Sequence, residues 1–115
     1  MNILICICTY NRNLQFEKCI NSFKKTYIPS NFNIKFLVVD NSINSNALNI
    51  VKDLRKKTQF NITYISETKR GIVNARNRVL LESKKIRSDY IAFFDDDCLI
   101  DKFCFKNIKN LIKDY

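Results

Sequence analysis

The sequence of 115 residues contains no histidine, one glycine and one proline. Without histidine, histidine-based acid–base catalysis and serine-type catalytic triads are excluded, and a zinc site would need four scattered thiolates. With Gly71 as the single glycine, the chain cannot form either glycine-rich phosphate-binding pattern, G-x-x-x-x-G-K-[ST] or G-x-G-x-x-G. P-loop and ordinary dinucleotide-binding functions are therefore excluded, and a metal ion must take over the phosphate-binding role of those loops.

Long hydrophobic segments are also missing. The apolar run at residues 1–8 lacks the basic leader and cleavage site of a signal peptide, and no stretch reaches the roughly 20 apolar residues that span a bilayer. Cysteines are odd in number and form no C-x-x-C pair, which suits reduced thiols in a cytosolic protein. We therefore expect a cytoplasmic protein, with peripheral attachment to the inner face of a membrane as a second option. The cysteines are Cys6, Cys8, Cys19, Cys98 and Cys104.

The chain is strongly basic but has no basic tail. Its net charge of +9 comes from 20 basic and 11 acidic residues that are spread along the chain. Such a charge can attract nucleic acid, anionic lipid or phosphorylated ligands. Because no aromatic residues are interleaved with a basic stripe, we expect a lysine-rich solvated surface and no nucleic-acid partner.

Apolar runs of strand length alternate with segments whose apolar residues recur at helical spacing. This alternation predicts an α/β fold, a three-layer sandwich with a mostly parallel sheet and helices on its faces, in which ligands bind outside the carboxyl ends of the strands. The third run is less apolar than the first two, which predicts a position near a sheet edge. The predicted strands are 3–8, 36–39, 62–65 and 89–94, and the predicted helices are 13–26, 44–57, 72–84 and 104–115.

Three consecutive carboxylates, Asp95, Asp96 and Asp97, follow the last predicted strand. Neighbouring carboxylates repel one another, and a cluster at the end of a buried strand calls for a compensating cation. Mg²⁺ or Mn²⁺ fits, because such an ion needs only one or two protein carboxylates when phosphate oxygens complete its shell. A polar turn that tolerates some repulsion in water is the plainer alternative.

Polar residues also follow the other three predicted strands, at 9–12, 40–42 and 67–71. Asp40 can accept hydrogen bonds from a base N–H or a ribose hydroxyl, and Arg76 and Lys69 can neutralise a diphosphate leaving group. This rim of mixed charge favours a site for a nucleotide and its metal ion. A phospho-acceptor receiver domain fits less well, because it needs acids after its first strand, where this chain has residues 9–11, Thr-Tyr-Asn.

Four segments together resemble motifs of family 2 glycosyltransferases. Residues 5–12, ICICTYNR, resemble the opening strand and T-Y-N-R motif, and residues 38–42, VVDNS, resemble V-D-D/N-S. Residues 67–80, ETKRGIVNARNRVL, resemble E-x-x-x-G-x-x-x-A-R-N-x-x-L, and residues 93–97, FFDDD, resemble the D-x-D motif. The four motifs occur in the family's order, which makes the match specific.

The resemblance implies a Rossmann-like GT-A fold that binds a nucleotide-diphosphate sugar, with UDP-sugars favoured, through Mg²⁺ or Mn²⁺. It implies that Asp97 binds the metal ion, that Asp95 contacts the ribose or sugar, and that Asp40 binds the base. Arg76 would lie beside the donor. The nucleotide-sugar site predicted in this way comprises Thr9, Tyr10, Asn11, Arg12, Asp40, Asn41, Arg76, Asp95 and Asp96, with Asp97 as the metal ligand.

The resemblance covers only the donor-binding half of the family's domain. The second half supplies the acceptor site, further strands and a carboxylate that acts as the catalytic base. Neither Asp101 nor Asp114 matches the position of that base, so no catalytic residue is assigned. We therefore expect residues 1–115 to form one glycosyltransferase domain that is truncated at its C-terminus.

Two functions are consistent with such a chain. The first is a hexosyltransferase-like enzyme that transfers a sugar from the nucleotide donor to an unknown acceptor, which could be a polysaccharide, a lipid or a protein. The alternative is an inactive nucleotide-sugar-binding fragment that needs a separately encoded second half. In both cases a sheet without its partner layer exposes apolar surface, which predicts association through the C-terminal side.

Overall fold

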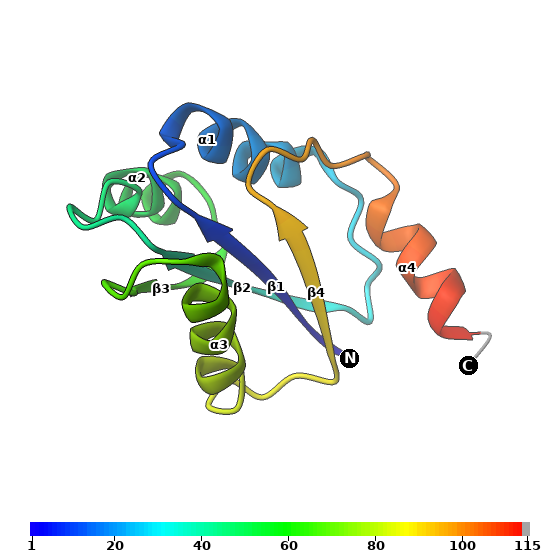
Figure 1. Cartoon of the computed structure of the whole chain (residues 1–115). Helices are drawn as coiled ribbons and strands as arrows, with labels where there is room; N and C mark the ends of the chain where they lie inside the picture. Colours follow the sequence, from blue (N-terminus) through cyan, green and yellow to red (C-terminus); the bar gives the residue numbers. More distant parts are fainter. Residues whose placement is uncertain (114–115) are drawn as a thin grey trace.

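The fold is a four-stranded parallel sheet with helices on both faces (Figure 1). The computed structural model describes residues 1–113, and Asp114 and Tyr115 of the last predicted helix lie outside the described residues. The strand order β3-β2-β1-β4 confirms the α/β class and the edge position of the third strand. The elements are β1 (Asn2–Thr9), α1 (Asn13–Ser22), η1 (Phe23–Lys25), β2 (Asn33–Asp40), α2 (Leu48–Lys57), β3 (Asn61–Ser66), α3 (Ile72–Ser83), β4 (Tyr90–Asp95) and α4 (Cys104–Lys113).

Two helices are shorter than the sequence periodicity predicts. The first predicted helix, 13–26, is divided into α1 and the 3₁₀ turn η1, a common way for a helix to tighten at its end. The second predicted helix, 44–57, begins only at Leu48. The reason is that the carboxylate of Asp40 accepts hydrogen bonds from the backbone N–H groups of Ser42 and Ala47, which holds the intervening segment as a loop.

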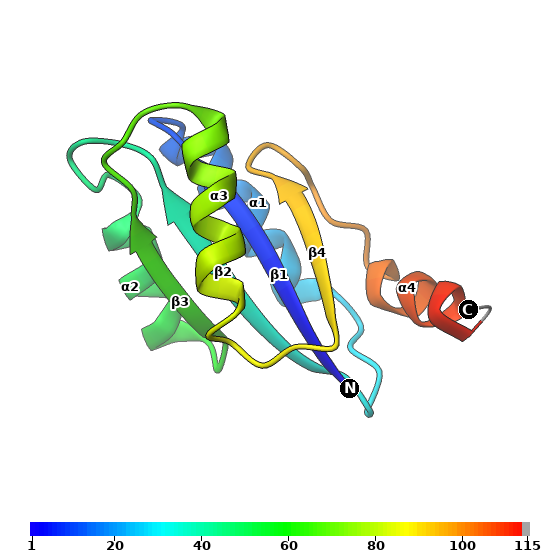
Figure 2. The same ribbon diagram turned by 60° about the horizontal axis from the view of Figure 1, so that its bottom comes forward.

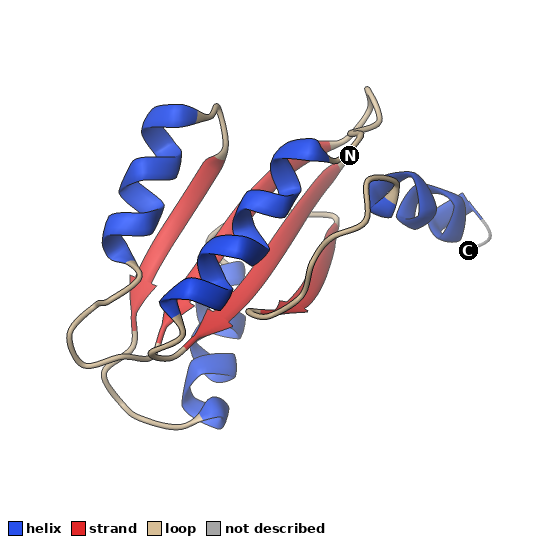
Figure 3. Cartoon of the chain, turned by 90° about the horizontal axis from the view of Figure 1, so that it is seen from above, coloured by secondary structure: helices blue, strands red, loops and turns tan. Residues whose placement is uncertain are grey.

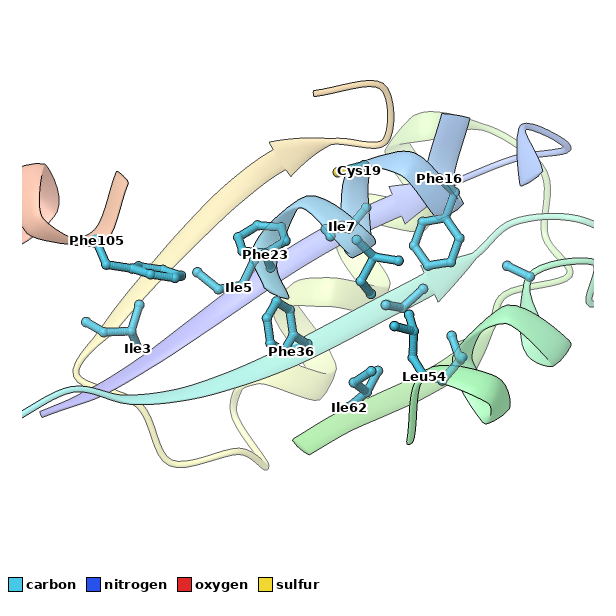
Figure 4. Close-up of a cluster of buried hydrophobic side chains, with 14 of the residues drawn as sticks. Ile3, Ile5, Ile7, Phe16, Cys19, Phe23, Phe36, Leu54, Ile62 and Phe105 are labelled. Carbon is cyan, nitrogen blue, oxygen red and sulfur yellow. The ribbon is translucent and has the colours of Figure 1, made fainter. Parts of the chain in front are cut away.

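The larger hydrophobic core lies between the sheet and helices α1 and α2 (Figure 4). Because side chains alternate along a strand, Ile3, Ile5 and Ile7 of β1 all point to this face. Phe23 packs edge-to-face on Phe36, with ring centroids 5.1 Å apart. Each fully buried side chain of this kind contributes roughly 1.5–3 kcal/mol, so this face anchors the sheet.

Of the helices described in residues 1–113, α3 is the one that covers the opposite face, where it lies across β1 and β2 (Figure 2). The strand register places Ile91 of β4 beside Leu4, and Phe93 beside Cys6, on this same face. Leu4 and Cys6 are fully buried, yet Ile91 is 43% and Phe93 51% exposed. Within residues 1–113, β4 therefore presents a bare apolar surface on this face, and the association predicted from such a surface stays a prediction.

Helix α4 lies beyond β4, at the side of the sheet (Figure 3). Its anchor is Phe105, which is fully buried and packs against Phe23 with ring centroids 6.0 Å apart.

Among residues 1–113, no helix combines the length and the apolar character needed to cross a bilayer. All five cysteines carry free thiols, and burial raises the pKa of Cys6 to about 12, so this thiol stays protonated in the core.

Candidate functional site

A cavity of about 990 Å³ opens where the carboxyl ends of β1 and β4 meet the N-terminus of α3. Parallel strands bring their carboxyl ends to one edge of the sheet, which explains why motifs far apart in the sequence meet here. Asn11, Asp40 and Lys69 do not line the cavity. The predicted site residues that do line it are Thr9, Tyr10, Arg12, Asn41, Arg76, Asp95, Asp96 and Asp97. The cavity wall also contains Arg70 and Gly71 of the predicted polar rim, together with residues that the sequence did not place there, Cys8, Ile72, Ala75, Phe93 and Phe94.

The three consecutive carboxylates have different surroundings. Asp96 is buried, and its carboxylate accepts a hydrogen bond of 3.0 Å from the hydroxyl of Thr9. Burial raises the pKa of Asp96, against the opposing effects of this hydrogen bond and of the Arg12 charge. Asp95 and Asp97 are exposed. The middle carboxylate therefore braces the loop against β1, while its two neighbours remain accessible from the cavity.

Asp95, Asp97 and the thiol of Cys98 together form a group of donors that could hold a metal ion. One potential ligand atom from each residue lies within 4.8 Å of those of the other two. The two carboxylates supply the oxygen ligands that Mg²⁺ and Mn²⁺ prefer, and the accessible side of the cluster leaves room for phosphate oxygens. The donor set therefore fits a divalent ion. Sequence reasoning missed Cys98, although its position directly after the three aspartates was a usable signal.

Asp40 lies under the rim and accepts three hydrogen bonds from its own chain. It is 1% exposed, and its carboxylate accepts hydrogen bonds from the backbone N–H of Ser42 at 3.0 Å and of Ala47 at 2.9 Å. The Tyr64 hydroxyl donates a third bond at 2.6 Å. Burial and the neighbouring Asp40 raise the pKa of Tyr64. Asp40 thus holds the loop after β2 in place, and its predicted contact with a base stays a prediction.

Asn41 connects the end of β2 to the loop that precedes α3. Its side-chain amide donates hydrogen bonds to the carbonyl oxygens of Glu67 at 2.8 Å and Lys69 at 3.0 Å. Its oxygen accepts one from the backbone N–H of Gly71 at 3.0 Å. Gly71 has φ +117°, a backbone conformation that residues other than glycine rarely adopt. Asn41 and Gly71 together therefore aim the N-terminus of α3 at the cavity.

Positive charge surrounds the cavity on the side of α3. Arg76 of α3 lines the wall, and its charge acts on the thiol of Cys8, whose pKa burial nevertheless raises to about 11. The N-terminus of α3 adds the partial positive charge of the helix dipole and its free backbone N–H groups. This part of the site is suited to an anion such as a phosphate group.

Tyr10 and Arg70 form a stacked pair at the edge of the cavity. The guanidinium carbon of Arg70 lies 5.2 Å from the centre of the Tyr10 ring, and Arg70 also donates a hydrogen bond to the Tyr10 hydroxyl. Such a pair presents flat surfaces that can stack on another planar group.

Asn11 has φ +49°, and its side-chain oxygen accepts a hydrogen bond of 2.6 Å from Asn46. Asn11 therefore supports the loop after β1 from outside the cavity wall.

Comparison with known sequences and structures gives one consistent result. The chain matches the domain described as Glycosyl transferase family 2 over residues 4–115. It is 31% identical over 97 residues to the succinoglycan biosynthesis protein ExoM of Rhizobium meliloti (strain 1021), a match that covers 84% of this chain and 30% of ExoM.

Solved structures extend the likeness to three dimensions. S. aureus TarS 1-349 superposes with a TM-score of 0.81 at 25% identity, covering 99% of this chain and 33% of TarS 1-349. The same protein in complex with UDP has a TM-score of 0.81 at 25% identity, covering 99% and 32%. Mannosyltransferase PcManGT from Pyrobaculum calidifontis, solved with GDP-Man and Mn²⁺, shares the fold with a TM-score of 0.77 at 19% identity, covering 96% and 31%.

The parallel sheet and these likenesses define an α/β domain of the GT-A type, as the resemblance in the sequence implies. The chain belongs to glycosyl transferase family 2. It spans about a third of the length of the proteins it matches.

Proposed function

We propose that this chain binds a nucleotide-diphosphate sugar together with a divalent metal ion and forms the donor side of a glycosyltransferase site. The observation that carries the proposal is the meeting in one cavity of the carboxylates 95–97, the guanidinium groups of Arg12, Arg70 and Arg76, and the N-terminus of α3. Carboxylates suit a divalent ion, whereas guanidinium groups and a helix N-terminus suit phosphate. The complexes of TarS with UDP and of PcManGT with GDP-Man and Mn²⁺ support this assignment.

Each group has a distinct role in the proposed complex. Asp97 holds the ion, as the resemblance implies. Asp95, for which the resemblance implies a contact with the ribose or sugar, lies close enough to Asp97 to share the ion instead. When bound, the ion supplies positive charge that stabilises a diphosphate leaving group. Arg76 adds a second positive charge from α3, and the Tyr10–Arg70 pair flanks the planar base. Thr9 keeps Asp96 oriented through its hydrogen bond. A UDP-sugar is the donor we favour, and a polysaccharide, a lipid or a protein could be the acceptor.

The second candidate function is donor binding without sugar transfer by this chain alone. Within residues 1–113, the carboxylates that line the cavity are those of Asp95, Asp96 and Asp97, and none is placed apart from this cluster to act as a base. Transfer would then require another polypeptide segment that supplies the base and the acceptor site. The bare surface of β4 at Ile91 and Phe93 is where we expect such a segment to dock.

Calorimetry with UDP, in the presence and absence of Mn²⁺, tests the proposal. We expect UDP to bind only when Mn²⁺ is present. Asp97→Ala should weaken that binding by about tenfold or more, because a charge-assisted contact is lost. Asp53→Ala is the matched control, since Asp53 is an exposed α2 carboxylate paired with Lys57. UDP binding that is indifferent to both Mn²⁺ and Asp97→Ala would overturn the proposal.

A further inference from the structure

Arg12 lies against the carboxylate that we assign to the metal ion. Its Nη2 atom is 3.0 Å from Oδ2 of Asp97, and its Nε atom is 3.5 Å from Oδ1 of Asp96. One guanidinium group therefore contacts two of the three consecutive aspartates and offsets part of their negative charge. The aspartate cluster keeps an excess of negative charge, so it can still attract a cation.

The two aspartates that pair with Arg12 differ in exposure. The side chain of Asp96 is 8% exposed, whereas those of Asp97 and Arg12 are 56% and 46% exposed. An ion pair that faces water is weak, because solvent screens the charges and holding long side chains in place costs entropy. The Arg12–Asp97 contact can therefore be displaced by a ligand that binds Asp97 more strongly.

The backbone of Arg12 is held by its neighbours, whereas its side chain is about half exposed. Its carbonyl oxygen accepts a hydrogen bond of 2.8 Å from the backbone N–H of Phe16, in the first turn of α1. The preceding residue, Asn11, is fixed by Asn46. Since the guanidinium group also lines the cavity, it can leave Asp97 and still contact a ligand bound there.

We infer that Arg12 is an internal counter-ion that occupies Asp97 in the ligand-free protein and competes with the divalent ion for this carboxylate. The inference rests on the proposed function, because it assumes a metal ion at Asp97. When the ion binds, the guanidinium group is released and pairs with the diphosphate of the nucleotide. Metal and nucleotide then bind cooperatively, because the nucleotide offers the displaced arginine a new partner.

The test measures the affinity for Mn²⁺ alone, without nucleotide, from the enhancement of water proton relaxation. Arg12→Gln removes the competing charge, and we expect it to raise the affinity for Mn²⁺ by roughly fivefold. Arg12→Lys keeps the charge and should stay near the wild-type affinity. Arg87→Gln is the matched control, since Arg87 is an exposed residue in the loop that precedes β4, at the opposite end of that strand, and it should change nothing.

The same proteins titrated with UDP in the presence of Mn²⁺ test the second half of the inference. In wild type, UDP should tighten Mn²⁺ binding more than it does in Arg12→Gln. Equal Mn²⁺ affinity in wild type and Arg12→Gln, with binding still lost in Asp97→Asn, would overturn the role of Arg12 and leave the proposed function intact. Absence of Mn²⁺ binding in every variant would overturn the proposed metal site itself. Circular dichroism verifies that each variant is folded.

Discussion

β2 and β4 are both apolar strands that end in an aspartate, but they have opposite surroundings. β2 lies between β1 and β3, and its last five residues are buried, including Asp40. β4 is an edge strand with one face open to solvent, and it ends in the exposed Asp95. At β2 the carboxylate is buried and holds a loop of its own chain, whereas at β4 the carboxylates of Asp95 and Asp97 are exposed at the cavity. The layer that covers a strand therefore decides how exposed the aspartate at its end is.

The largest expected effect comes from removing the carboxylate of Asp40. Asp40→Ala leaves the N–H groups of Ser42 and Ala47 and the hydroxyl of Tyr64 without their acceptor, which should lower the free energy of unfolding by roughly 3–4 kcal/mol. Asp97→Ala, at the open strand end, should change it by less than about 0.5 kcal/mol. Urea denaturation of both variants provides the measurement. Similar losses in the two variants would show that the strand ends do not differ in this way.

The apolar residues of the two strands should also respond differently. Leu37→Ala, at a fully buried position of β2, should destabilise the chain by roughly 2–3 kcal/mol through the cavity that it leaves. Phe93→Ser, on the bare face of β4, should cost less and should reduce self-association of the chain. Sedimentation velocity over a range of concentrations distinguishes these effects. If wild type sediments as a monomer at every concentration, the expected association through β4 is wrong.

The smallest expected effect concerns Glu82 of α3, whose carboxylate neither holds a loop in place nor lines the cavity. The hydrogen bond from Arg78 holds the pKa of Glu82 below its ordinary value of 4.5. A lowered folded-state pKa means that the stabilisation is fully present above pH 4.5 and is lost as the pH falls through the folded-state value. The stability difference between wild type and Glu82→Gln should thus shrink on acidification, in thermal unfolding at several pH values. A difference that grows with acid would contradict this direction.

Much of the fold follows from the sequence pattern, and the boundaries follow from tertiary contacts. The apolar runs place all four strands, and their alternation with helices predicts the parallel sheet. The predicted start of the second helix, residue 44, was wrong. The helical spacing of apolar residues extends through residues 44–47, but the buried carboxylate of Asp40 holds that segment as a loop. The hydrogen bond from Ala47 to Asp40 leaves no periodic pattern in the sequence, so the spacing of apolar residues cannot predict it.

In the candidate site, too, the sequence predicts one part and tertiary contacts decide the other. The motifs predict most of the cavity wall, including Thr9, Arg76 and the three aspartates. They do not predict that Asp40 is buried whereas Asp97 is exposed, because each aspartate simply follows an apolar run. The pairing of Arg12 with Asp97 appears only when β1 and β4 lie side by side.

By itself, the sequence determined the class of fold, the family, and the edge of the sheet at which polar residues gather, because alternating patterns and motif order are local properties of the chain. The tertiary structure alone decided which of these residues are buried and which are exposed at the cavity. Asp40, between β1 and β3, is buried and hydrogen-bonded within its own chain, whereas Asp97, beyond the open side of β4, is exposed and paired with Arg12. Availability depends on which neighbours cover a group, and those neighbours are distant in the sequence.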